Sequence, residues 1–265
     1  MSLRSGLGAV RRQLLSSFRS RMAPLTNNAP LVSFCFDDFP RTAYLSGGAI
    51  LKRFGARGTY YAAPGLMDRS NELGEQFTQG DLESLLAEGH ELGCHTFSHI
   101  SCRKVSAEAF ASDVQKGREA LLSMTGRNPL NFAYPFGHVT LAVKNTIGSR
   151  MTSCRGIYGG VNRGSVDLNL LRANSLYGGC DKAGDYGALF NLDGDRRSWL
   201  LFYTHDVRES PSPFGCTPSL LERVVSMALV KGFQIALVQD VVSKLGRTSN
   251  ITSQNITNRA IAGVE

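Results

Sequence analysis

Residues 33–40 read Ser-Phe-Cys-Phe-Asp-Asp-Phe-Pro, a short apolar run that ends abruptly in two adjacent carboxylates. Similar runs recur along the chain and alternate with longer segments of helical spacing, which predicts parallel strands joined by helical crossovers. Barrels built in this way carry their reactive groups after the carboxyl ends of the strands. The stretch therefore predicts Asp37 and Asp38 at a barrel mouth, although an Asp pair after a strand can also serve only to cap the next turn.

Seven or eight apolar runs of strand length, alternating with helical segments, suggest an α/β barrel of the (β/α) type. The expected strands are Leu31–Phe36, Gly58–Ala63, Glu91–Cys94, Asn131–Tyr134, Met151–Cys154, Leu170–Leu176, Leu200–Tyr203 and Gln234–Val238. Helical spacing marks Thr78–Glu88, Ser106–Thr125 and Thr217–Lys231, with Ser106 as an N-cap and Pro218 at a first helical position.

The composition is that of one ordinary globular domain. The 265 residues are 42% hydrophobic and 19% charged, which excludes a disordered or fibrous chain. We expect a basic arm and linker over residues 1–29, the barrel over 30–247 and a polar tail over 248–265. The six cysteines form no CxxC pair, so we expect buried, reduced thiols.

The net charge of +7 is concentrated at the N-terminus, where five arginines precede the first acidic residue. They are Arg4, Arg11, Arg12, Arg19 and Arg21. No other basic stretch contains interleaved aromatic residues, so we expect no nucleic-acid partner.

Residues 1–22 place Leu7, Val10, Leu14 and Phe18 on one helical face. This segment is either a helix that makes weak contact with an anionic membrane surface or a helical arm with no such role. No apolar stretch has the length of a signal peptide or a membrane span. We therefore expect a cytoplasmic protein, membrane-peripheral if the arm binds lipid.

Three of the five histidines follow strand-like runs. His95 and His99 lie four residues apart, a spacing that lets two imidazoles reach one divalent ion, although isolated pairs of this kind are often coincidental. His205 follows the run that ends at Thr204, and it is either a functional group or a structural histidine bonded to Asp206. We interpret the other two, His90 and His138, as surface residues or residues that support a site.

Residues 131–137 form an aromatic strand end closed by a Pro-Phe-Gly turn. Such a turn can present the backbone N–H of Phe136 to an oxyanion, or it can be only a tight turn with core aromatics.

These four stretches, in this order, resemble the polysaccharide deacetylase family, also called the NodB-homology domain or carbohydrate esterase family 4. The resemblance covers roughly residues 31–246. It implies a distorted (β/α) barrel of about seven βα units that hydrolyses an acyl group from an amino sugar. It also implies Asp37 as the base and His205 as the acid, with Asp38, His95 and His99 as metal ligands.

The chain departs from the family pattern at several positions. Phe39 replaces the usual Gly after the Asp pair, and Ala133 replaces the usual Arg before the Pro-aromatic turn. Arg155, after the next strand, is our candidate to fix Asp37 by a bidentate contact, against the alternative of a surface ion pair. The element that supports the catalytic His in the family is not recognisable. If the barrel is correct, Phe39, Arg41, Tyr134 and Phe214 are candidate substrate contacts, although aromatics at strand ends are more often core.

One carboxylate and two imidazoles leave coordination positions open for water and substrate, as in catalytic metal sites. Zinc is favoured, and cobalt, nickel, manganese or iron would also fit. The leading hypothesis is an N-deacetylase acting on an amino-sugar-containing glycan or glycoconjugate inside a bacterial cell. An O-acetyl esterase or deformylase, a catalytically silent carbohydrate-binding barrel, and a structural cluster without metal stay open as alternatives.

Overall fold

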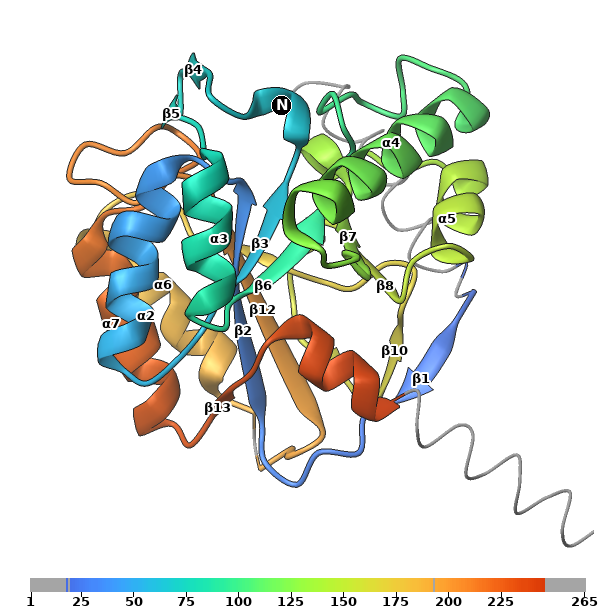
Figure 1. Ribbon diagram of the computed structural model, residues 1–265. Coiled ribbons are helices and arrows are strands. Elements are labelled where there is room, and N and C mark those ends of the chain that lie inside the picture. Colours follow the sequence, from blue (N-terminus) through green and yellow to red (C-terminus); the bar gives the residue numbers. More distant parts are fainter. Residues whose placement is uncertain (1–17, 19, 193, 246–265) are drawn as a thin grey trace, which may run out of the picture.

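A computed structural model describes residue 18 and residues 20–192 and 194–245 (Figure 1). The predicted arm up to residue 17, with its proposed membrane contact, and the predicted tail 248–265 lie outside the described residues. Among the described helices, none combines the length and apolarity needed to cross a membrane.

The core of the molecule is a curled, largely parallel sheet. Its strands run in the order β11-β12-β2-β3-β6-β7-β8, with β13 paired to β2 and the short antiparallel β9 paired to β12. The members are β2 Leu31–Asp38, β3 Thr59–Ala62, β6 Glu91–Cys94, β7 Asn131–Ala133, β8 Ser153–Arg155, β9 Asn162–Arg163, β11 Asn174–Ser175, β12 Ser198–Thr204 and β13 Gln234–Ile235.

The two outer strands of this sheet are joined by the segment before β11. Leu171 N donates to Cys154 O at 2.8 Å and Gly156 N donates to Leu171 O at 3.0 Å, which forms a parallel bridge between Arg155 and Leu171. The sheet therefore curls into the predicted distorted (β/α) barrel, and the fold class is confirmed. The expected strand Leu170–Leu176 is reduced to this bridge and the two residues of β11.

Helices cover the outside of the barrel (Figure 1). All three predicted helices are present, as α3 Gln79–Ala87, α4 Ala107–Thr125 and α7 Pro218–Val230, and Ser106 caps α4 by accepting from Ala109 N at 3.2 Å. The remaining helical elements are η1 Ala43–Gly48, α2 Ala49–Arg53, η2 Pro64–Leu66, η3 Pro135–Gly137, α5 Leu141–Gly148, η4 Cys180–Lys182, α6 Ala183–Gly187 and η5 Ala188–Phe190. Residues 238–245 are also helical.

The side chains along each strand alternate between the two faces of the sheet. They form two hydrophobic cores, one between the sheet and the helices and one inside the barrel. On β2, Phe34 and Phe36 face the helices, whereas Cys35 faces the barrel interior with Leu201 of β12. Because neighbouring residues of a strand point to opposite faces, Asp37 continues the inward series. Five of the six cysteines are buried and Cys180 is exposed, and all six are free thiols.

A short strand precedes the barrel. β1 Met22–Pro24 pairs antiparallel with β10 Ser165–Asp167, and the Arg21 guanidinium donates to Gly148 O and Met151 O at 2.8 and 2.9 Å. Part of the segment that we expected to be a linker is therefore packed on the barrel. A second two-stranded sheet, β4 Ser70–Asn71 with β5 Gly74–Glu75, forms a hairpin between β3 and α3.

Candidate metal centre and active site

Left-handed backbone marks the ends of the strands that carry the predicted motifs. Asp38, Phe39, Thr96, His99 and Phe136 all have φ between 52° and 66°, a range that side chains other than Gly rarely adopt. Such conformations cost roughly 1–3 kcal/mol each and cluster at functional sites. In β2 this turn matters directly, because it brings Asp38 to the same cavity as its neighbour Asp37.

Asp38, His95 and His99 converge at the barrel mouth. Their ligand atoms lie within 4.8 Å of one another, and Asp38 Oδ1 lies 3.3 Å from His95 Nε2 and 3.0 Å from His99 Nε2. Burial opposes the charge of Asp38, but the two imidazoles outweigh it and hold the pKa of Asp38 below its usual range. Asp38 Oδ1 is buried and has no hydrogen bond of good geometry, so the three groups fit a shared cation better than they fit one another.

The imidazole of His95 is held in place by its surroundings. His95 is 2% exposed and its Nδ1 lies 2.8 Å from Ala133 O, which leaves Nε2 facing Asp38. A ligating histidine commonly donates its other ring nitrogen to a carbonyl in this way.

The turn between the two histidines is fixed from helix α4. The Asp113 carboxylate accepts from Phe97 N at 3.1 Å, from Ser98 N at 3.0 Å and from Ser98 Oγ at 2.9 Å. Gly117, one turn later, allows the close approach, because a Cβ there would lie 2.6 Å from the backbone of Thr96. Asp113 is therefore part of the support of the histidine pair.

Arg155 reaches Asp37 inside the barrel. Its Nη2 pairs with Asp37 Oδ1, and the guanidinium lies 5.0 Å from the ring centre of Tyr61 and 4.9 Å from that of Tyr203. Burial opposes the charge, but Asp37 outweighs it and holds the pKa of Arg155 above its usual value. The side chain is 1% exposed, so it is no surface ion pair, and the contact has one point rather than the two we expected because Nη1 donates to Gly156 O at 3.0 Å.

His205 follows β12 and is oriented by the loop after it. Its Nδ1 lies 3.1 Å from Phe214 O. A proton on Nδ1 can be donated to this carbonyl, and Nε2 is then the ring nitrogen that remains for other partners. Asp206 does not hold the imidazole: it is fully buried and accepts from Ser212 N at 2.8 Å and Ser212 Oγ at 2.5 Å. A main-chain carbonyl therefore occupies the role that we could not assign from the sequence.

These groups share one cavity of about 250 Å³. The predicted residues that line it are Asp37, Asp38, His95, His99, Phe136, His205 and Phe214. Sequence reasoning missed Glu72, Leu73, Ile157, Tyr177 and Tyr203, which also line it. Burial raises the pKa of Tyr177 and Tyr203, so both phenols stay protonated and can donate.

Three expected substrate contacts do not line this cavity, and for Phe39 and Tyr134, whose side chains are buried in the core, the prediction is wrong. Phe39 is fully buried and stacks on Phe77 at 5.0 Å, because the left-handed backbone at residues 38 and 39 turns its ring into the core. Tyr134 is 2% exposed and packs edge-on against Phe132 at 5.1 Å. Arg41 lies outside the cavity lining and pairs with Asp81 at 2.9 Å.

The two remaining histidines differ from each other. His90 is 5% exposed and its Nδ1 accepts from Gly58 N at 2.9 Å, so it is neither a surface residue nor part of the site. His138 bonds Ser101 Oγ at 2.7 Å, and its ring lies 5.7 Å from that of Phe136, next to the cavity.

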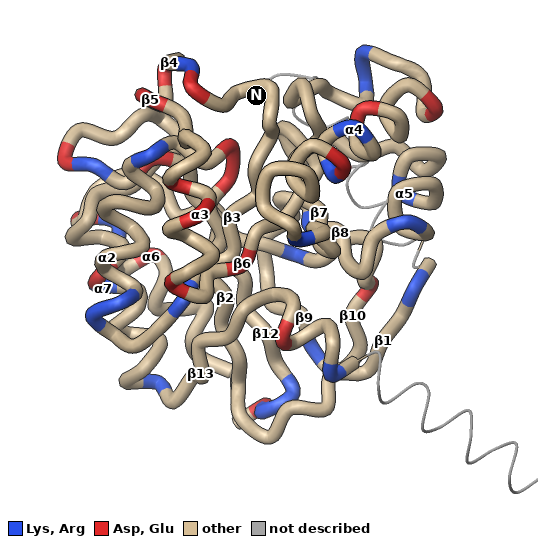
Figure 2. The backbone as a smooth tube through the Cα atoms, viewed as in Figure 1, with Lys and Arg blue, Asp and Glu red and all other residues tan. Residues whose placement is uncertain are grey.

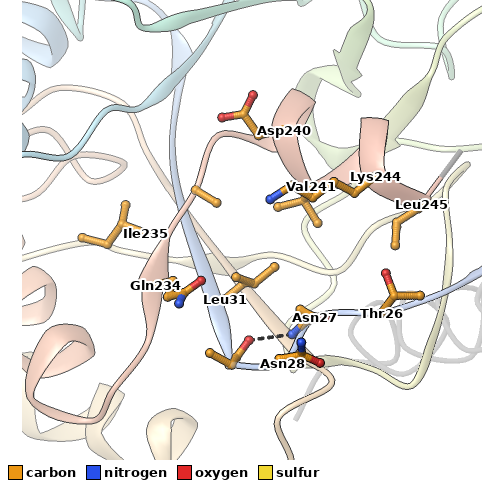
Figure 3. A pocket seen from close by; sticks show the side chains of 12 residues that line it. Thr26, Asn27, Asn28, Leu31, Gln234, Ile235, Asp240, Val241, Lys244 and Leu245 are labelled. Atoms are coloured by element: carbon orange, nitrogen blue, oxygen red, sulfur yellow. Dashed lines mark hydrogen bonds between the residues drawn. The ribbon is translucent and has the colours of Figure 1, made fainter. Parts of the chain in front are cut away.

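A larger cavity, of about 660 Å³, lies at the opposite end of the strands (Figure 3). It is lined by residues 26–29, Leu31, residues 234–236 and one face of the helical segment 240–245. Among the described residues that line it, the titratable groups are Asp240 and Lys244, which is a poor set for hydrolysis. The chemistry therefore points to the smaller cavity.

Comparison with known proteins agrees with this geometry. The family model described as polysaccharide deacetylase matches residues 25–155, which include Asp37, Asp38, His95, His99 and Arg155. The chain belongs to the polysaccharide deacetylase family. The resemblance drawn from the motifs is thus confirmed, while His205 lies beyond the matched residues.

A curated relative is the peptidoglycan-N-acetylglucosamine deacetylase PgdA of Listeria monocytogenes. The chain is 27% identical to it over 141 residues, which are 52% of the chain and 28% of the relative. The chain thus spans well under two thirds of that protein.

Solved structures share the fold at low identity. The chitin deacetylase of Colletotrichum lindemuthianum has a TM-score of 0.57 at 19% identity, covering 82% of this chain and 89% of its own. A family 4 acetyl xylan esterase from Clostridium thermocellum, in complex with a cobalt ion, has a TM-score of 0.54 at 18% identity over 80% and 90%. A family 4 pseudoenzyme, a BA3943 mutant, has a TM-score of 0.57 at 11% identity over 84% and 71%.

Proposed function

We propose that this protein is a metal-dependent hydrolase that removes an N-acetyl or other N-acyl group from an amino sugar in a glycan or glycoconjugate. The observation that carries the proposal is the convergence of Asp38, His95 and His99 beside Asp37 and His205 in one cavity. The Listeria relative named for peptidoglycan N-acetylglucosamine supports the substrate class.

Asp38, His95 and His99 would hold one divalent ion. Zinc is favoured by the two imidazoles, and the cobalt in the Clostridium structure is consistent with a site that accepts several metals. When bound, such an ion polarises a carbonyl and lowers the pKa of a bound water to about 7.

The residues of the chain would then move the protons. Asp37 accepts a proton from the attacking water, and Arg155 holds the carboxylate in place from inside the barrel. The backbone N–H of Phe136 donates to the oxyanion, a type of contact whose loss costs about 3 kcal/mol in other enzymes. His205 delivers a proton from Nε2 to the departing amine, which is otherwise a poor leaving group.

Two alternatives rest on specific observations. Hydrolysis of an O-acetyl ester, the reaction for which the Clostridium neighbour is named, requires the same attack on a carbonyl. A catalytically silent barrel, here one that binds carbohydrate, is the second alternative, and the neighbour named as a family 4 pseudoenzyme is a precedent for the loss of activity. The presence of both Asp37 and His205 argues against the second alternative, because a binder needs no proton-transfer pair. Deformylation and a cytoplasmic, membrane-peripheral location stay predictions from the sequence.

The test combines elemental analysis with turnover. We expect about one equivalent of metal in the wild type, lost in His95→Ala and His99→Ala, since each variant removes one of three protein ligands. The zinc- and cobalt-loaded proteins are then assayed for acetate release from N-acetylated and O-acetylated sugars. No metal after reconstitution would remove the mechanism, and metal without acetate release would favour the binding barrel.

A further inference from the structure

The hairpin of β4 and β5 stands at the edge of the active-site cavity. Its two turn residues, Glu72 and Leu73, line the cavity, and Leu73 is 2% exposed. The side chain of Asn71 shapes the turn, because its Oδ1 accepts from Leu73 N at 2.9 Å and from Gln76 Nε2 at 3.1 Å. The hairpin tip is thus a built part of the cavity wall.

Arg208 ties this tip to the loop that follows β12. Its Nη2 donates to Glu72 O at 3.1 Å, and its Nε pairs with Asp206 Oδ2 at 2.7 Å. Because Asp206 is fully buried and holds Ser212, the arginine is anchored on the side of the catalytic loop. One side chain therefore joins two segments that are 136 residues apart.

The position of the link follows from the strand order. The hairpin comes after β3 and Arg208 after β12, and β2 lies between these strands in the sheet. The hairpin and the loop after β12 are neighbours at the same end of the barrel, where residues of both charges gather (Figures 1 and 2). The link thus spans the side of the mouth where β2 delivers Asp37 and Asp38.

The other side of the mouth is apolar and exposed. Phe136 and Ile157, which follow β7 and β8, are 54% and 38% exposed, and both line the cavity. Phe214, 48% exposed, extends the apolar rim from the far end of the loop after β12, beside His205. The cavity of about 250 Å³ is smaller than the roughly 300–1,000 Å³ of pockets that enclose drug-sized ligands. It suits one sugar unit rather than several.

We propose that the Arg208 link closes one side of the active-site mouth, so that the protein deacylates a terminal amino-sugar unit or a small conjugate and not the interior of a polymer. A polymer that presents an interior unit must leave the mouth on both sides of that unit. The hairpin, Arg208 and the loop after β12 together form a wall over β12, β2 and β3. The side of the mouth that this wall leaves open is the apolar one. The inference rests on the proposed function and specifies its substrate.

The experiment uses N-acetylglucosamine and its β-1,4-linked oligomers up to the hexasaccharide with the metal-loaded full chain. Mass spectrometry locates the deacetylated unit, and kcat/KM is measured for each length. In the wild type we expect deacetylation at a chain end and no gain in kcat/KM beyond the disaccharide. In Arg208→Ala we expect interior deacetylation and a ratio of hexasaccharide to monosaccharide kcat/KM at least about tenfold higher.

Two further variants make the result specific. Leu73→Ala lowers the wall from the hairpin side without touching Asp206, and it should shift the product position in the same direction. Arg163→Ala removes an exposed arginine of β9, which pairs with the first residues of β12 at the far end of the barrel, and it should leave the product pattern unchanged. Interior deacetylation by the wild type, or an unchanged pattern in both wall variants, would overturn the proposal.

Calorimetric binding of the same oligomers separates this proposal from the reaction itself. Suppose that no oligomer is turned over, that affinity is independent of oligomer length in the wild type, and that it rises with oligomer length in Arg208→Ala. The proposed wall would then be supported and the proposed reaction refuted. If affinity already rises with length in the wild type, the wall is refuted. Absence of binding by every oligomer would refute both.

Discussion

The two ends of the barrel both contain buried carboxylates, in very different surroundings. At the amino ends of the strands, Glu91 accepts only from neutral donors: Thr59 Oγ1 at 2.8 Å, Asn131 Nδ2 at 2.6 Å and Gln239 N at 2.9 Å. At the carboxyl ends, Asp37 faces an arginine and Asp38 faces two imidazoles. Burial, opposed by these hydrogen bonds, raises the pKa of Glu91, whereas the imidazoles lower that of Asp38.

The comparison separates groups that hold the fold together from groups that are placed to react. Glu91 joins β3, β6 and β7 to the helical segment 238–245, and every one of its oxygens is satisfied. Asp38 has an oxygen without a good hydrogen bond and a left-handed backbone. Unsatisfied atoms and strained backbone persist where function requires them.

The sharpest test exchanges a carboxylate for an amide at each end. Asp37→Asn should retain the metal but lose about 10²–10⁴ in kcat, because an amide cannot accept the proton of the attacking water. Glu91→Gln, the matched control, should retain both metal and kcat and lose about 1–2 kcal/mol of unfolding free energy. Metal analysis, acetate release and urea denaturation report these quantities. A Glu91→Gln protein that is folded but inactive would break the distinction between the two ends.

The second test moves the arginine. Arg155→Ala leaves the Asp37 carboxylate buried without its partner and should cost about 3–5 kcal/mol of unfolding free energy together with turnover. Ala133 is the register neighbour of Arg155 across β7 and β8, so Ala133→Arg combined with Arg155→Ala restores the arginine to the usual family position. We expect the double variant to recover part of both losses.

Arg155→Lys is the control for this exchange. It keeps the charge but loses the planar group that lies against Tyr61 and Tyr203, and it should recover less turnover than the double variant. If the double variant were no better than Arg155→Ala in both denaturation and acetate release, the inference that the arginine has moved between neighbouring strands would fail.

The same contrast explains what the sequence could predict. The proposed metal ligands Asp38, His95 and His99 were predictable because Asp38 ends β2 and His95 directly follows β6, with His99 four residues later, and the barrel gathers strand ends at one place. Arg155 was predictable only as a candidate, because its contact with Asp37 joins residues 118 positions apart. Phe39 was misplaced because its position depends on two left-handed residues that no local pattern reveals. Leu73, Ile157 and Tyr177 carry no motif and are brought to the cavity by tertiary structure alone.

Asp113 tests whether support from outside the cavity matters at the metal end. Asp113→Ala removes the carboxylate that accepts from Ser98 N and Ser98 Oγ, and it removes one of the two acceptors of Phe97 N, which keeps its 3.0 Å hydrogen bond to the backbone carbonyl of residue 113. The turn between His95 and His99 is then held less firmly. Loss of a partner that orients metal ligands typically costs about 10–100-fold in metal affinity, which we expect here for zinc.

Competition with a zinc chelator measures this affinity, and Ser112→Ala, at the exposed neighbouring position of α4, is the control. Equal zinc affinity in the two variants would show that the histidine turn keeps its shape without Asp113. If Asp113→Ala instead lowered kcat with zinc fully bound, the residue would act on the reaction geometry rather than on the metal.

The smallest expected effect concerns the two imidazoles at opposite ends of β6. His95 faces the proposed metal site, whereas His90 is buried with its Nδ1 accepting from Gly58 N. Burial, partly opposed by Glu88, lowers the pKa of His90. A histidine with a pKa below its unfolded value of about 6.5 stabilises the fold above that pH and loses this contribution as the pH falls through it, by at most about 1.4 kcal/mol per pH unit. His90→Asn keeps an acceptor for Gly58 N but cannot be protonated, so its unfolding free energy should fall less than that of the wild type between neutral and mildly acidic pH. Urea denaturation of the metal-free proteins isolates this difference from the metal site, and parallel pH profiles for the two proteins would show that His90 does not titrate on unfolding.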